Sequence, residues 1–81
     1  MTEHEIFNKL VNILKKDLKV TMDIKEDMAL IGDGILDSME LMSYVTIVEE
    51  TFNVEISNTE LEGENLGVIK NMMSFLKKKA Q

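Results

Sequence analysis

The chain has 81 residues, enough for one small hydrophobic core, and we therefore expect a single domain over residues 1–81. It contains no cysteine, which excludes disulfides, thiolate metal ligands and a cysteine nucleophile. Polar residues recur through the first 18 residues, and no apolar run is long enough to cross a membrane. We expect a cytoplasmic monomer without a signal peptide and without membrane insertion.

The net charge of −6 is distributed unevenly along the chain. Residues 23–64 hold twelve acids and one base, Lys25, whereas residues 65–81 hold four lysines and no acid. This argues against nucleic-acid binding through the middle of the chain, because phosphate contacts need a basic face. It favours a partner with a basic docking patch. The alternative is that most of these acids only keep a small protein soluble.

The first half of the chain predicts one helix followed by a long loop. Residues 2–5 (Thr-Glu-His-Glu) have the form of a capping box, and apolar residues then recur at helical spacing, which predicts a helix over 3–18. Residues 20–36 show no sustained period and contain two glycines, which predicts an ordered loop with one helical turn near 25–29. The apolar residues expected to hold this loop to the core are Met28, Leu30, Ile31, Ile35 and Leu36.

Three more helices are predicted in the second half. Asp37 can cap a helix over 38–51, with Glu40 completing a capping box and an apolar stripe at Leu41, Val45, Val48 and Phe52. Residues 57–60 can cap a short helix that ends before Gly63. Asn65 is predicted to cap a last helix, whose buried face comprises Leu66, Ile69, Met72 or Met73, and Leu76. We therefore predict an all-α four-helix bundle with a long first loop and a short third helix.

Ser38 is the residue best placed to carry chemistry. A helix start favours negative charge, so a phosphate ester on Ser38 would be stabilised there. As a nucleophile Ser38 would need a nearby base, but the only histidine is His4 and there is no Gly-x-Ser-x-Gly motif. On local chemistry alone, an ordinary structural serine at a helix start is favoured.

The wider sequence resembles a known family. Residues 34–41 (Gly-Ile-Leu-Asp-Ser-Met-Glu-Leu), followed by Val45, residues 48–50 (Val-Glu-Glu) and Phe52, resemble the acyl and peptidyl carrier proteins over nearly the whole chain. Three positions depart from the usual family pattern. Met39 stands where leucine is usual, Ser43 where fatty-acid carriers commonly have glutamate, and Ser57 where many members have proline. The motif is more similar to that of stand-alone peptidyl, D-alanyl or specialised acyl carriers than to that of the housekeeping fatty-acid carriers.

The resemblance implies a function and a set of site residues. A phosphopantetheinyl transferase would attach phosphopantetheine to Ser38, with Asp37 as the adjacent motif residue and cap and Met39 beside it. The arm would hold acyl, aminoacyl or peptidyl thioesters for enzymes of fatty-acid, polyketide or related biosynthesis, and the chain would not itself be an enzyme. Glu40, Glu49 and Glu50 would meet basic patches of partner enzymes. Met42 is either an apolar contact beside the arm or part of the core.

Two alternatives remain beside the carrier hypothesis. One is an unmodified helical interaction module with the same fold, and the other is a hydrolase that uses Ser38. The acids around Asp33 lack the alternation of a calcium loop, so we assign no metal site.

Overall fold

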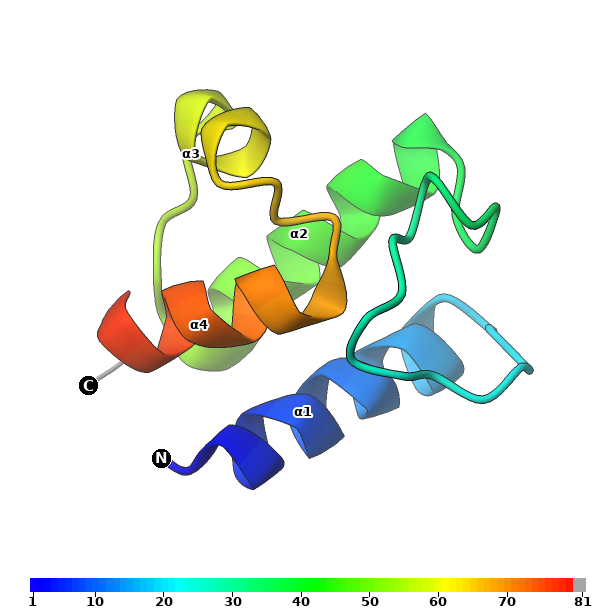
Figure 1. The fold of residues 1–81 in the computed structure, drawn as a ribbon, viewed down its shortest axis with the longest axis horizontal. Helices are drawn as coiled ribbons and strands as arrows, with labels where there is room; N and C mark the ends of the chain where they lie inside the picture. Colours follow the sequence, from blue (N-terminus) through cyan, green and yellow to red (C-terminus); the bar gives the residue numbers. More distant parts are fainter. Residues whose placement is uncertain (80–81) are drawn as a thin grey trace.

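The computed structural model describes residues 1–79, and its fold is all-α (Figure 1). The described residues form helices α1 (Glu3–Asn12), α2 (Ser38–Phe52), α3 (Asn58–Gly63) and α4 (Ile69–Lys79). Helices α1 and α4 lie side by side and run in opposite directions, while α2 crosses behind them and α3 stands apart from the other helices (Figure 1). The predicted architecture, including the long first loop and the short third helix, is confirmed.

Helix α1 begins where the sequence predicts and changes its form before it ends. The Thr2 side chain accepts a hydrogen bond from the Glu5 amide, and the Glu5 carboxylate accepts one from the Thr2 amide, which completes the capping box. From Ile13 to Asp17 the backbone winds as a π-helical turn that continues α1. The helical segment therefore reaches nearly to the predicted end at Leu18, with a wider last turn that periodicity did not predict.

The core lies between α1, α2 and α4, and apolar side chains supply all of its buried residues. Most of the predicted core positions are buried, although Leu41 is only half-buried. The prediction missed three core residues, Ile24, Tyr44 and Phe75. Met72 and Met73 are both buried, where one of the two was expected. The buried part of the core beneath α4 is therefore wider than a single helical stripe.

The predicted start of the last helix at Asn65 is wrong, because α4 begins at Ile69. Asn65 adopts a left-handed conformation with φ 52° and does not cap a helix. The backbone that follows pairs with the long loop. The amide of Leu30 donates to the carbonyl of Gly67, and the amide of Ile69 donates to the carbonyl of Met28. This pairing, which includes an isolated bridge between Ala29 and Val68, uses backbone groups that an earlier helix start would need.

The long loop is held to the core by fewer side chains than predicted. Leu30 and Leu36 are buried, Met28 and Ile35 are half-buried, and Ile31 is 45% exposed, so the prediction for Ile31 is wrong. The expected turn near residue 25 is present as a hydrogen bond from the Met28 amide to the Lys25 carbonyl. The loop thus leaves one apolar side chain on the surface near the start of α2.

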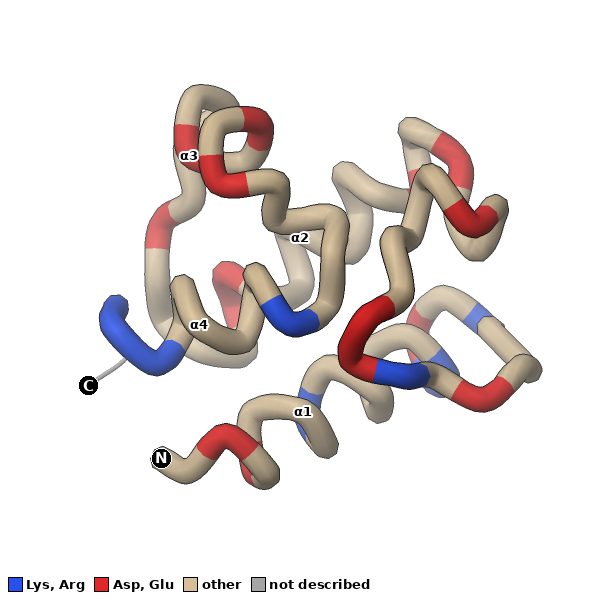
Figure 2. The backbone as a smooth tube through the Cα atoms, in the orientation of Figure 1, with Lys and Arg blue, Asp and Glu red and all other residues tan. Residues whose placement is uncertain are grey.

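Charge is segregated in the folded chain as it is in the sequence. Figure 2 shows acids along the long loop and around α3, and lysines at the far end of α4. Lys79 pairs with Glu60 of α3 at 3.0 Å, and Lys77 pairs with Glu3 at the start of α1 at 3.9 Å. Both involve partly exposed side chains, so each contributes little to stability.

Candidate functional site at the start of α2

The start of α2 is fixed by a reciprocal capping box. The Asp37 carboxylate accepts a hydrogen bond from the Glu40 amide at 2.8 Å, and the Glu40 carboxylate accepts one from the Asp37 amide at 2.9 Å. Gly34, three residues before Asp37, has φ +72° and gives the loop its last tight turn. These features position Ser38 as the first residue of α2.

Ser38 is exposed, and the local backbone is arranged to favour an anion. The amides of Glu40 and Leu41 donate to Asp37, whereas those of Ser38 and Met39 have no acceptor among the described residues. Unpaired amides at the positive end of a 15-residue helix favour a phosphate. The next residue, Met39, is 82% exposed, so its side chain extends into solvent and does not pack over the serine.

The arrangement around Ser38 offers no general base. His4 lies near the start of α1, at the opposite end of the molecule from the start of α2 (Figure 1). Its ring nitrogen is 3.2 Å from the Asn8 side chain. The carboxylates nearest in sequence, Asp37 and Glu40, each have one oxygen engaged by a backbone amide in the capping box. With the histidine at the far end of the molecule and these carboxylates engaged in capping, a nucleophilic role for Ser38 is not favoured.

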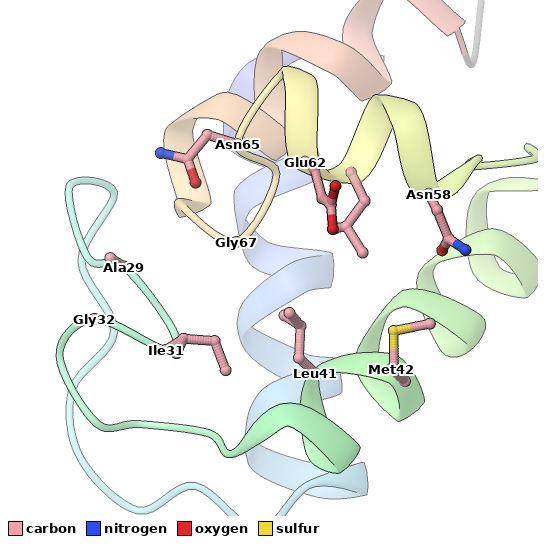
Figure 3. A pocket seen from close by; sticks show the side chains of 10 residues that line it. Ala29, Ile31, Gly32, Leu41, Met42, Asn58, Glu62, Asn65 and Gly67 are labelled. Carbon is pink, nitrogen blue, oxygen red and sulfur yellow. The ribbon is translucent and has the colours of Figure 1, made fainter.

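A groove lies beside this end of α2, with a volume of about 510 Å³. Figure 3 shows Leu41 and Met42 of α2 pointing into it, with Ile31 of the long loop opposite. Asn58 and Glu62 of α3, together with Asn65, line its other side (Figure 3). The groove thus combines an apolar floor with a polar rim. Met42 is 47% exposed on this floor and is not a core residue.

Sequence reasoning did not find this groove, because its walls come from segments far apart in the chain. The half-buried Leu61 of α3 completes the lining. The long loop signalled an unusual structure, but the pairing of Ala29 with Val68 that brings α3 opposite α2 has no local sequence signature.

The three glutamates of α2 lie in different environments. Glu40 is exposed but bonded within the capping box. Glu49 is half-buried, and its carboxylate accepts a hydrogen bond from the Ile56 amide at 2.8 Å. Glu50 is exposed. Between Glu40 and Glu49 the helix has no charged residue, so its outward surface there is neutral.

The burial of Tyr44 in α2 was not predicted from the sequence. Its side chain is fully buried, and its hydroxyl has no hydrogen-bond partner among the described residues. Burial raises the pKa of Tyr44, which keeps the phenol neutral.

Comparison with known proteins shows the family of the chain. The family model for the phosphopantetheine attachment site matches residues 8–73. The chain belongs to this family.

Curated relatives include the acyl carrier proteins of Lactobacillus acidophilus and Lactobacillus johnsonii, each 30% identical over 78 residues and covering 95% of both chains. The acyl carrier protein of Campylobacter hominis is 30% identical over 73 residues, covering 89% of this chain and 90% of the relative. No solved structure gives a significant match.

Membership of the phosphopantetheine-attachment family makes the protein a carrier and not a catalyst. Its cofactor is phosphopantetheine, attached covalently through a serine, and the exposed start of α2 fits such a group. The carrier works with a phosphopantetheinyl transferase and with partner enzymes, and the unmodified interaction module is not favoured. Among residues 1–79 no helix is long and apolar enough to span a membrane.

Proposed function

We propose that Ser38 carries the phosphopantetheine arm and that the chain presents thioester-linked acyl groups to partner enzymes. The observation that carries this proposal is the exposed serine at the first position of α2, beside two amides without acceptors and a groove of about 510 Å³. Acyl cargo is favoured over aminoacyl or peptidyl cargo because the curated relatives are named acyl carrier proteins.

Residues next to Ser38 have distinct roles in this proposal. Asp37 fixes the helix start through the capping box, so that the serine hydroxyl faces an incoming transferase. Met39, at 82% exposure, and Met42, at 47%, offer apolar contact beside the arm. The chain itself binds, orients and presents the cargo. The arm supplies the thiol, which this chain lacks.

Docking of partner enzymes combines charge with apolar contact. Glu50 is the α2 glutamate whose exposed carboxylate is free to meet a basic patch, while Glu40 offers its remaining oxygen. The charge of Glu49 adds to the negative electrostatic potential of α2, but its carboxylate already accepts a hydrogen bond from the Ile56 amide. We infer that Glu40 and Glu50 make docking dependent on salt. The neutral surface of α2 contributes the part of the docking free energy that does not depend on salt.

The attachment proposal is tested by modification. The purified protein is incubated with coenzyme A and a broad-specificity phosphopantetheinyl transferase, and its intact mass is measured. We expect a gain of one phosphopantetheine group, and no gain in Ser38→Ala. Ser43→Ala is the matched control, because Ser43 is an exposed serine of the same helix. A gain that persists in Ser38→Ala would sink the proposal.

The docking proposal is tested separately by the transferase rate as a function of salt. Changing Glu40 and Glu50 together to glutamine should slow modification at low salt and flatten its salt dependence. Glutamine at residue 40 retains the capping box, so the fold is preserved. An unchanged rate and salt slope would leave these acids as solubility devices only.

A further inference from the structure

The buried hydroxyl of Tyr44 is a polar group that makes no hydrogen bond to the described residues of the unloaded protein. It is the one buried side-chain oxygen or nitrogen of residues 1–79 without a hydrogen-bond partner. Leaving a buried hydroxyl unpaired costs stability, and phenylalanine would fill the same space without that cost. An orphaned hydroxyl of this kind points to a partner that arrives with a ligand.

Tyr44 does not line the groove beside Ser38, but it lies on the same face of α2 as a residue that does. Leu41, whose side chain forms part of the groove floor, is three residues earlier and therefore one turn back on the same face of α2. Long side chains on a helix lean toward its N-terminus and over the preceding turn. The phenol of Tyr44 thus extends toward Leu41 and toward the Ser38 end of the helix. Leu41 lines the groove and is half-buried, whereas Tyr44 is fully buried.

The opposite wall of the groove is weakly held. Helix α3 has six residues and no buried side chain. Leu61 is half-buried, and the ion pair between Glu60 and Lys79 ties α3 to the end of α4 at 3.0 Å. Elements with few buried apolar contacts open at low free-energy cost. An acyl chain entering the groove can therefore displace α3 and Leu41 more easily than the core beneath them.

We propose that Tyr44 is a specificity-determining residue that hydrogen-bonds an oxygen along the acyl chain, so that the carrier holds oxo- or hydroxyacyl cargo in preference to fully saturated chains. This inference rests on the proposed function, since the cargo reaches Tyr44 from the arm on Ser38. The phenol can donate to a ketone oxygen, or donate to and accept from a hydroxyl. Either contact satisfies the hydroxyl that the unloaded chain leaves unpaired.

The experiment compares matched cargoes in matched proteins. Wild type and Tyr44→Phe are loaded on Ser38 with an octanoyl arm, or with octanoyl arms that carry a ketone at successive positions. The rate of thioester cleavage by hydroxylamine is then measured for each. For each cargo the rate in Tyr44→Phe is divided by the rate in wild type, which cancels intrinsic differences in thioester reactivity.

We expect this ratio to be near one for octanoyl and to rise about two- to tenfold for at least one ketone position, the effect of one neutral hydrogen bond. A ratio near one for every cargo would overturn the inference. Failure of the arm to attach to Ser38, seen in the intact mass, would instead overturn the proposed function and this inference with it.

A second measurement tests the unpaired state directly. Unloaded Tyr44→Phe should unfold at the same temperature as wild type or higher, because no hydrogen bond is lost. A clearly lower unfolding temperature would mean that the hydroxyl already has a partner, such as a buried water, and would also overturn the inference.

Discussion

Glu49 and Glu50 are adjacent acids of α2, and their different environments predict opposite consequences of substitution. The Glu49 carboxylate accepts a hydrogen bond from the half-buried Ile56 amide at 2.8 Å, which fixes the link from α2 to α3. The same link is held by the Val54 amide, which donates to the Glu49 carbonyl at 3.1 Å. Glu50 is exposed on the helix surface. Glu49→Ala should therefore destabilise the fold, and Glu50→Ala should not.

The magnitude follows from the hydrogen bond. A bond to a charged group contributes about 1.5–3 kcal/mol, and partial exposure reduces this because water can reach the orphaned amide, so we expect a loss of about 1–2 kcal/mol. Any helix-propensity gain of alanine over glutamate is shared by the two variants and cancels in their comparison. With an m-value of about 1 kcal/mol/M, the urea midpoint of Glu49→Ala should fall by about 1–2 M.

The assay is urea unfolding followed by far-UV circular dichroism for wild type, Glu49→Ala, Glu49→Gln and Glu50→Ala. Glu49→Gln keeps an amide oxygen as acceptor and should lie between wild type and Glu49→Ala. Equal midpoints for Glu49→Ala and Glu50→Ala would refute the structural role of Glu49. Because Glu50→Ala keeps the fold, a slower transferase reaction in that variant reports a lost contact.

Three further predictions concern other positions. Gly34→Ala should cost about 1 kcal/mol because its φ is +72°, whereas Gly63→Ala should be neutral or slightly stabilising, and thermal unfolding distinguishes them. The amide of Ser57 and the Lys79 ammonium lower the pKa of Glu60 below its usual 4.5, so its charge stabilises the fold above that pH. The advantage of wild type over Glu60→Gln should therefore be present at neutral pH and be lost as pH falls below 4.5 and through the lowered pKa, in unfolding curves recorded at each pH. Asp37→Ala should lose about 1 kcal/mol and slow modification of Ser38, while Asp37→Asn should keep most of the stability, as measured by thermal unfolding and intact mass.

Local signals in the sequence were sufficient to predict a helix where its capping residues and its apolar periodicity agree. The box of Asp37 and Glu40 and the stripe ending at Phe52 predicted α2 nearly to the residue. The box of Thr2 and Glu5 did the same for the start of α1. Capping and periodicity are both properties of neighbouring residues, so the folded structure did not need to be known.

Predictions failed where partners come from distant segments. Asn65 has the composition of a helix cap, yet the amide and carbonyl groups around it pair with Met28 and Leu30, and this pairing delays α4 to Ile69. Ile31 is apolar but lies in the groove and not in the core. The hydrogen bonds that delay α4 join residues more than 30 positions apart, and the groove around Ile31 is lined by residues of α2 and α3, so no local pattern encodes either outcome.

The helix start that bears Ser38 was predictable from the sequence, but its surroundings were not. Ser38 followed from the helix start and the family resemblance, whereas the orphaned hydroxyl of Tyr44 became visible only in the packed core. An aromatic residue beside the apolar stripe is ordinarily read as packing alone. Burial without a hydrogen-bond partner is what separates Tyr44 from that reading.

The charge of the arm itself should be measurable in the stability of α2. A phosphodiester on Ser38 gains from the helix dipole, by about 0.3–1 kcal/mol, and from the unpaired amides of Ser38 and Met39. It loses about a few tenths of a kcal/mol by Coulomb repulsion from each nearby carboxylate, since Asp37 is adjacent and Glu40 is two residues away. The gain should be the larger effect, so the modified protein should unfold at a higher temperature than the unmodified one, and added salt should reduce the difference.

Glu40→Gln isolates the repulsive part, because glutamine keeps the capping box without the charge. The stabilisation on modification should then increase by about a few tenths of a kcal/mol relative to wild type, the size of the lost Coulomb repulsion. Thermal unfolding of the modified and unmodified forms of both proteins, at low and high salt, gives the stabilisation on modification for each protein at each salt concentration. If modification stabilises both proteins equally and independently of salt, the phosphate does not interact with the helix start, and the electrostatic account of Ser38 is wrong.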